Sequence, residues 1–480
     1  MNKYIKNYIL STANIIMMLL FPIITFPYVS RILGPSNLGI INFAQSYGYY
    51  FTHIASFGIS SYAIREISKI RDDKEKTEKI SNEIFNLNLF FSILSTILYF
   101  CGVFFVQNFR NNFLIFTIYS VVIFSNFLSL DWLLQSFDDY YFSTIRNLII
   151  RIFSVAAVFI FVKYEEDYVK YMVITCVTEM GTKVSSLMYC RRNYAMLRVR
   201  KMFLNFKDHI KPMFVLFTFR LVNGVSSNLD KLMIGFMIEY VNVGIYSAGV
   251  KFVLMISPIV ETVGIVLFPK INISARNSSD EYIKNLKINY DMILLMGIPM
   301  TVGMYLVSGR LIPFIAGGQY AEAVTVSRIM SGIILLGPIG DMFGSKTLLV
   351  FKKDRWLLFC SLAVALSNVV LNFAFIPLWG INGAAIASIL SYIVAVSARY
   401  YFTRKLVKIN LFNKSLVKYG FFTVPFIILY VLFQSQIDTN TLWMFGFIGV
   451  CGLIYVSELL LSGDYLVRMM IEKTIKKGKV

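Results

Sequence analysis

The sequence predicts an all-α membrane protein that crosses the bilayer about fourteen times. Three observations predict this class. The chain contains about fourteen apolar stretches of membrane-spanning length, short segments connect them, and these connectors alternate between strongly basic and nearly uncharged. A helix needs roughly 20 mainly apolar residues to cross the hydrocarbon core. Lys and Arg accumulate in the connectors that stay in the cytoplasm.

The apolar stretches define the spans in chain order, because each one ends where charged or turn-forming residues begin. We expect spans at about 9–30, 40–63, 83–107, 113–135, 144–162, 169–189, 212–237, 243–268, 289–314, 322–349, 357–377, 382–402, 416–434 and 441–462. Prolines interrupt several of them, as is common in the helices of alternating-access transporters.

The charges in the connectors predict the orientation. Basic residues gather at the chain start, at 65–79, 146–151, 191–211, 270–287, 346–355 and 399–418, and on the tail. The opposite connectors and their edges hold only Arg31, Arg110, Lys163, Lys170 and Arg310. Both termini are therefore expected in the cytoplasm. The net charge of +19 reports topology, and no nucleic-acid partner is expected, because the charges do not gather on one face.

The short connectors exclude several classes of function. None is long enough to fold into a soluble domain, so a primary pump with a nucleotide site is not expected. The run from Gly340 to Thr347 resembles a phosphate-binding loop but lies inside an apolar span, with a Ser between its Gly and its Lys. Two histidines and five scattered cysteines offer no metal-ligand spacing. We expect no cofactor and no catalytic residue.

The second span carries a row of polar side chains. They follow helical spacing of three or four residues and stay within about 60° of one line along the helix: Asn42, Gln45, Tyr49, His53, Ser56 and Ser60. Amides, hydroxyls and aromatic rings are the groups that bind sugars. The alternative is that the row makes hydrogen bonds between helices. We favour a cavity wall, because such bonds rarely need a continuous line.

The seventh and eighth spans carry cations at membrane depth. Arg220 and Lys231 share one face of the seventh span, with Asp230 beside them, and Lys251 lies in the eighth. Charged groups are costly in the bilayer and usually face the bundle interior or water. Cations spaced across the bilayer suit a polyanionic headgroup such as a pyrophosphate. The alternative is internal pairing, with Asp230 neutralising Lys251 or an acid elsewhere neutralising Lys231.

A short internal repeat predicts the domain organisation. The run that begins at Gly39 has a counterpart at Gly244, six spans later, so both copies enter the membrane in the same direction. Parallel repeats of this kind build two similar lobes. We expect a lobe of six helices at 1–208, a second lobe of six at 209–405, and two extra spans with a basic cytoplasmic tail at 406–480.

Several motifs together resemble one family. Val29–Gly39 and Ala55–Ser60 leading to Arg65 and Glu66 resemble the opening motifs of bacterial polysaccharide-unit flippases of the Wzx type. Asn228–Gly235 followed by Val243–Ala248 resembles the motif of their second lobe, and Leu371–Pro377 followed by Gly380–Ala387 their eleventh-to-twelfth span junction. The resemblance covers most of residues 10–405.

The resemblance implies a fold, a cargo and partners. The fold is that of the multidrug/oligosaccharidyl-lipid/polysaccharide exporter superfamily, with two lobes in a V like the MATE transporters. The cargo is an undecaprenyl-pyrophosphate-linked oligosaccharide for O-antigen, capsule or exopolysaccharide, moved from the inner to the outer leaflet of the bacterial inner membrane. The implied partners are this lipid-linked oligosaccharide, the bilayer, a polysaccharide polymerase and a chain-length regulator.

Proteins with related functions usually carry features that this sequence lacks. Cation-coupled drug exporters usually place an acid in the first span, and residues 9–30 contain none. Lipid II flippases usually carry arginines there, whereas the only one here is Arg31 at its outer end. Teichoic-type exporters stay open as an alternative. A membrane glycan polymerase would need a large outer loop. The expected substrate-binding residues are Asn42, Gln45, Tyr49, His53, Arg31, Arg220, Asp230, Lys231 and Lys251.

Overall fold

The computed structural model describes residues 3–194 and 206–469, apart from the side chains of 3–20, 206–208, 219–227, 263, 265 and 266. Every described element is a helix or a turn, so the predicted all-helical class is confirmed. The chain contacts divide it into two compact units, Met1–Gly244 and Ile245–Val480. The lobe boundary predicted at 208/209 stays a prediction.

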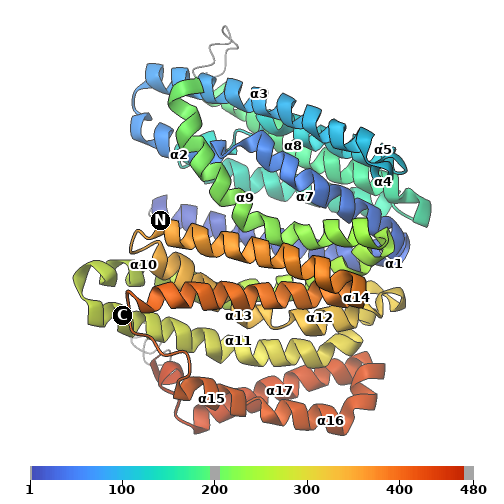
Figure 1. The fold of residues 1–480 in the computed structure, drawn as a ribbon, viewed down its shortest axis with the longest axis vertical. Helices are drawn as coiled ribbons and strands as arrows, with labels where there is room; N and C mark the ends of the chain where they lie inside the picture. Colours follow the sequence, from blue (N-terminus) through green and yellow to red (C-terminus); the bar gives the residue numbers. More distant parts are fainter. Residues whose placement is uncertain (1–2, 195–205, 470–480) are drawn as a thin grey trace. The chain divides into compact units, whose positions relative to one another are not determined.

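The first unit consists of helices that run side by side (Figure 1). In chain order they are α1 (Lys3–Ser56), α2 (Ile59–Ile70), α3 (Lys74–Phe105), α4 (Gln107–Arg110), α5 (Phe113–Phe124), the 3₁₀ turn η1 (Ser125–Leu128), α6 (Asp131–Ser136), α7 (Tyr140–Phe161), the 3₁₀ turn η2 (Glu165–Asp167), α8 (Tyr168–Tyr194) and α9 (Phe206–Met237). α1 packs against α3, α5, α7 and α9 and is the central helix of this unit.

The second unit begins within α10 and continues to the end of the chain. Its elements are α10 (Tyr240–Asn277), α11 (Ser279–Ala316), the 3₁₀ turn η3 (Gly318–Tyr320), α12 (Ala323–Met330), α13 (Ile333–Phe343), the π-helical turn η4 (Gly344–Leu348), α14 (Asp354–Arg404), α15 (Lys414–Phe421), α16 (Val424–Thr439) and α17 (Thr441–Leu461). α11 contacts α12, α13, α15, α16 and α17 and is the hub of this unit.

Two of these helices each contain two predicted spans. α1 is kinked at Gly34 (φ 72°, ψ 172°) and α14 at Gly380 (φ 56°, ψ −134°). Only glycine adopts such angles at little cost, so each kink separates the two spans that hydropathy predicted there. Among the described residues, nine helices are long and apolar enough to cross a membrane. The protein is thus a multi-pass membrane protein.

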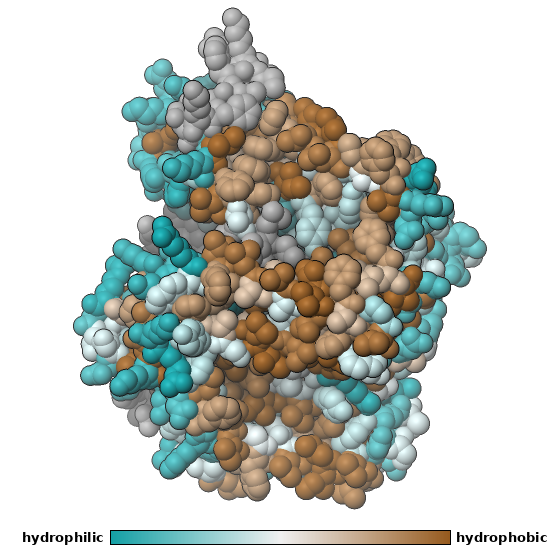
Figure 2. Space-filling view, in the orientation of Figure 1, coloured by the Kyte–Doolittle hydropathy of each residue, from teal (hydrophilic) through white to brown (hydrophobic). Residues whose placement is uncertain are grey.

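The surface has the polarity that a membrane protein needs. Large apolar side chains point outward from the middle of the helices, among them Phe153 (71% exposed) and Leu453 (72%). Figure 2 shows apolar residues over the middle of the helices of both units and hydrophilic ones near the helix ends. An apolar outer surface is costly in water but favourable in lipid.

The glycines that begin the predicted repeat lie against each other in the first unit. A Cβ on Gly39 would lie 1.8 Å from the carbonyl oxygen of Tyr240, and one on Gly244 would lie 2.0 Å from that of Pro35. No side chain fits at such distances, so glycine is required at both positions for the start of α10 to approach α1 this closely. The repeat-related segments therefore form one close helix crossing.

The second predicted span is shorter than expected. α1 ends at Ser56, and Phe57 (φ 35°) and Gly58 (φ 74°) turn the chain into α2. Ser60 consequently lies in α2, so the prediction of one unbroken helix over 40–63 was wrong. The apolar run continues through this turn because α2 is itself amphipathic, with Ile59, Ala63 and Ile67 buried, and hydropathy alone does not detect the turn.

Candidate functional site

The polar row lies on the half of α1 that follows the kink. Asn42, Gln45, Tyr49 and His53 are each half-buried, and the rings of Tyr49 and His53 meet edge to face with centroids 4.3 Å apart. Phe43, on another face of the same helix, is fully buried. The row is thus a partly accessible polar face on a helix whose opposite side is fixed by apolar packing.

The predicted acid and cation of the seventh span lie on the neighbouring helix α9. Asp230 is 3% exposed, whereas Lys231 is half-buried and interacts electrostatically with it. Tyr50 on α1 also lies within electrostatic range of Asp230. The ring of Phe43 packs 5.2 Å from that of Phe236 on α9. The structure therefore brings the α1 row and the Asp230–Lys231 pair onto adjacent helices of one unit.

The other predicted site residues are placed separately. Arg31 lies on α1 before the kink and is exposed. Lys251 is half-buried on α10, in the second unit. Arg220 lies in α9, but its side chain is outside the described part of the structure.

An ion pair that the sequence did not predict lies inside the first unit. Arg146 on α7 donates to both carboxylate oxygens of Asp131 on α6, at 2.7 and 3.0 Å, and Ser186 on α8 donates to the same carboxylate at 2.6 Å. The Arg146 side chain is 4% exposed and that of Asp131 39%. Charge counting had assigned Arg146 to a cytoplasmic connector, whereas its guanidinium binds Asp131, whose carboxylate joins α6, α7 and α8.

Lys183 on α8 supports the break between α5 and α6. Its Nζ donates to the carbonyl of Val122 at 2.7 Å and lies 3.4 Å from the hydroxyl of Ser125. The ammonium thus satisfies a carbonyl that the end of α5 leaves without an intrahelical donor.

A histidine on α9 links this helix to α2 and α3. His209, 5% exposed, lies 2.7 Å from the hydroxyl of Tyr62 through Nδ1 and 3.0 Å from the carboxylate of Glu83 through Nε2. These three residues come from α9, α2 and α3. The sequence offered no signal for this contact, since a lone histidine near a span end has many uses.

The acid pair Asp138–Asp139 is part of a turn. Asp138 (φ 57°) accepts from Arg71 at 2.9 Å. Asp139 accepts from the hydroxyls of Tyr189 and Tyr194 at 2.7 and 3.1 Å. These contacts give the acid pair a structural role in the turn between α6 and α7.

The Arg65–Glu66 motif lies in α2, near its basic end. Glu66 accepts from Arg65 Nε at 2.8 Å and from Lys69 Nζ at 3.1 Å. Partial burial raises the pKa of the Glu66 carboxyl, but the bonds from Lys69 and Arg65 outweigh it, so the pKa is lowered. The motif is therefore a local charge cluster.

The second unit contains a buried cation of its own. Lys346, in the π turn η4, donates to Asp341 on α13 at 2.8 Å, and its side chain is 4% exposed against 46% for Asp341. The sequence had counted Lys346 among the cytoplasmic connector charges. It lies within the helical segment because the π turn continues the tenth span through this residue.

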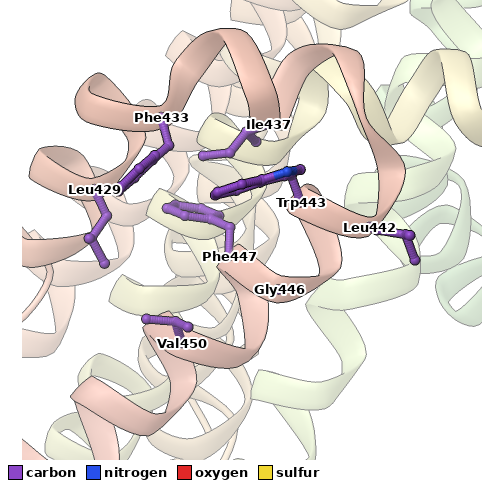
Figure 3. Close-up of a pocket in the computed structure, with 8 residues that line it drawn as sticks. All are labelled: Leu429, Phe433, Ile437, Leu442, Trp443, Gly446, Phe447 and Val450. Carbon is purple, nitrogen blue, oxygen red and sulfur yellow. The ribbon is translucent and has the colours of Figure 1, made fainter.

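The second unit also contains an apolar hollow of about 340 Å³ between α16 and α17. Figure 3 shows the rings of Phe433, Trp443 and Phe447 gathered around it. Phe433 and Trp443 stack with centroids 5.6 Å apart. Leu429, Ile437, Leu442, Gly446 and Val450 complete the lining. This lining suits hydrocarbon and offers little to a sugar or a phosphate, so the hollow is distinct from the polar row.

Solved structures with a similar architecture identify the fold class. The lipid II flippase MurJ, in an inward closed conformation, matches with a TM-score of 0.79 at 17% identity, over 95% of this chain and 99% of that chain. A multidrug-resistance MATE family transporter of the MOP superfamily, in an inward-facing conformation, matches with a TM-score of 0.53 at 11% identity, over 81% and 94%. The fold is therefore that of MurJ- and MATE-like membrane transporters.

Sequence comparison identifies the family within this class. The family described as polysaccharide biosynthesis protein matches residues 5–275, more than half of the chain, so this chain belongs to it. A protein of Escherichia coli (strain K12) named "Putative O-antigen transporter" is 20% identical over 385 residues, which cover 80% of this chain and 93% of that protein. The resemblance inferred from the motifs is confirmed at the level of the family and the fold.

Proposed function

We propose that this protein flips an undecaprenyl-pyrophosphate-linked oligosaccharide from the cytoplasmic to the outer leaflet of the bacterial inner membrane. The observation that carries the proposal is the half-buried row Asn42, Gln45, Tyr49 and His53 beside the Asp230–Lys231 pair. Family membership and the name of the Escherichia coli relative support a polysaccharide precursor as the cargo.

Side chains of different chemistry contact different parts of the cargo. Amide and hydroxyl groups of the α1 row exchange hydrogen bonds with sugar hydroxyls, and the Tyr49 ring covers an apolar C–H face. Lys231, together with Arg220 and Lys251, attracts the pyrophosphate. Asp230 holds the Lys231 ammonium in place, and Arg31 lies near the outer end of the path. The polyprenyl tail remains in lipid.

Transport proceeds by alternating access of the two lobes and needs no covalent chemistry. Both termini lie in the cytoplasm on the positive-inside rule. A polysaccharide polymerase and a chain-length regulator are the proposed partners on the outer side, because the flipped unit is the substrate of polymerisation.

The test removes the cation while the protein stays in the membrane. Lys231→Ala should abolish surface polysaccharide, because the pyrophosphate loses its charge partner, and Lys231→Arg should retain part of it. Lys287→Ala, an exposed lysine on α11, is the matched control and should leave polysaccharide intact. Membrane abundance of each variant is measured in parallel by immunoblot.

A second variant covers the case in which Lys231→Ala does not accumulate in the membrane. Tyr49→Ala leaves both charges in place and should reduce polysaccharide strongly, because the sugars lose a ring face. Normal surface polysaccharide in both Lys231→Ala and Tyr49→Ala would refute the assignment. Drug resistance on overexpression, without a polysaccharide defect on deletion, would instead favour a drug exporter.

A further inference from the structure

The segment 401–421 comprises the end of α14, the connector that follows it and α15, and it has an unusual composition. It contains five basic residues and no Asp or Glu: Arg404, Lys405, Lys408, Lys414 and Lys418. By contrast, the basic connector at 270–287 also contains Asp280 and Glu281. We call 401–421 the basic–aromatic segment, because it also contains aromatic residues.

Hydrogen bonds to α11 and α14 fix the backbone of this segment. Tyr290 donates to the carbonyl of Leu411 at 2.8 Å, and Asn413 donates to the carboxylate of Asp291 at 2.8 Å. Asp291 is fully buried. Tyr400 donates to the carbonyl of Ile409 at 3.0 Å. The residues before and after position 412 are thus both held from inside the unit.

This anchoring leaves apolar side chains exposed. Phe412 is 83% exposed between the two held residues, and Val417 and Phe421, one turn apart on α15, are 74% and 69% exposed. Such exposure is costly in water. It is favourable if these side chains enter the acyl layer beside the helix ends.

The cations lie beside these apolar side chains. Arg404, Lys405, Lys408 and Lys414 are exposed. The ammonium of Lys405 lies 4.5 Å from the ring centre of Tyr401. Lys418, by contrast, is paired with Asp464 at 2.6 Å. Phe412, Lys414, Val417 and Lys418 are among the residues that line an open hollow of about 530 Å³ at the start of α15.

We propose that the basic–aromatic segment binds the headgroup of an anionic phospholipid of the leaflet that it faces. Exposed lysines meet the phosphate, and Phe412, Val417 and Phe421 enter the acyl layer beneath it. Charge complementarity selects this occupant: the exposed lysines attract anionic lipids, while a zwitterionic headgroup gains little from them. The site holds the junction between α14 and the last three helices against the membrane surface.

The test uses the full chain in nanodiscs made of phosphatidylcholine alone or with added phosphatidylglycerol. Hydrogen–deuterium exchange of peptides covering 401–421 should slow in a phosphatidylglycerol-dependent way. The triple variant Lys405→Gln, Lys408→Gln and Lys414→Gln should lose this protection, since each neutralised lysine weakens binding about five-fold. The matched control Lys270→Gln, Lys284→Gln and Lys287→Gln removes the same charge from exposed positions on α10 and α11 and should retain it.

Two further measurements show which lipid supplies the phosphate and keep the test valid if the triple variant does not fold. Undecaprenyl phosphate added to phosphatidylcholine discs offers the same phosphate chemistry from a cargo-like lipid. Protection by this lipid alone, or equal exchange in both phosphatidylcholine and phosphatidylglycerol discs, would overturn the proposal. Phe412→Ser keeps every charge and should weaken but not abolish protection, so that a result remains even if the triple variant does not fold.

Discussion

Both compact units contain a buried cation paired with an aspartate, but one pair connects several helices and the other lies within one chain segment. In the first unit, Arg146 on α7 bonds Asp131 on α6 through two nitrogens, and Ser186 on α8 adds a third helix. In the second unit, Lys346 bonds Asp341 only five residues earlier in the same chain segment. The cations are equally buried, at 4% exposure.

The local helix geometry explains the difference. Residues five apart point about 140° away from each other on a regular α-helix. The π turn, in which the amide of Leu349 donates to the carbonyl of Gly344 at 3.1 Å, widens the helix after Asp341 and allows Lys346 to reach back. The first unit instead breaks the span into α5, η1 and α6 and fixes the break from outside. One pair therefore connects helices, whereas the other stabilises a single distorted one.

The largest effect is expected from removing the acid of the first unit. Asp131→Leu leaves the guanidinium of Arg146 buried without its carboxylate, and an arginine cannot lose its proton. We expect a loss of about 3 kcal/mol in the free energy of unfolding, measured by SDS titration in micelles. Asp131→Asn keeps one acceptor and should lose less. Equal stability of Asp131→Leu and the unchanged protein would contradict the interhelical role.

A smaller effect is expected from the corresponding change in the second unit. Asp341→Leu strands Lys346, but a buried lysine can give up its proton and so avoid much of the cost. We expect a loss of about 2 kcal/mol or less in the same titration. A loss larger than that of Asp131→Leu would reverse the comparison between the two pairs.

The third helix of the first pair can be tested by itself. Ser186→Ala removes the hydroxyl that bonds Asp131 from α8, and water can replace it, because the Asp131 side chain is 39% exposed. A loss of about 1 kcal/mol is expected. Ser185→Ala, whose hydroxyl bonds only the carbonyl of Gly181 on its own helix, is the control. An equal loss in the control would remove the argument for a three-helix junction.

The smallest effect concerns the turn between α7 and α8. Asp167 accepts from Lys170 at 2.6 Å and from the amides of Lys163 and Tyr164, and these bonds lower its pKa to about 2. Because the folded pKa lies below the unfolded one, the contribution is present above about pH 4 and is lost as the pH falls through 2. The melting temperature of Asp167→Asn should therefore be lower at pH 7, with the difference shrinking between pH 4 and pH 2. A constant difference over this range would exclude the charged turn.

Hydropathy predicted the all-helical class and the spans on either side of Gly34 and Gly380, but not the turn within residues 40–63. The kinks at Gly34 and Gly380 keep each of these two pairs of spans in one continuous helix, and their backbone angles leave no trace in hydropathy. The turn at Phe57–Gly58 was missed because the apolar pattern continues on α2. The buried pairs were missed for a related reason. Arg146 and Lys346 stand near span ends in the sequence, and a count of charges along the chain does not contain the packing that buries them.

The part of the candidate site that lies on a single helix, α1, was predictable from the sequence. The row from Asn42 to His53 follows from helical spacing alone, and the structure places all four side chains at half burial. Whether Asp230 and Lys231 lie beside that row depends on the packing of α9 against α1, which spacing does not contain. The rings of Phe43 and Phe236 supply that contact in the structure.

Deleting the gene and locating the lipid-linked glycan that accumulates tests the central proposal most directly. Membranes of the deletion strain are prepared as sealed right-side-out and inverted vesicles, and the glycan is labelled from each side. The account predicts an undecaprenyl-pyrophosphate-linked oligosaccharide that is labelled only from the cytoplasmic face, with normal distribution restored by the intact gene. Accumulation on the outer face, or an unchanged distribution in the deletion strain, would contradict it.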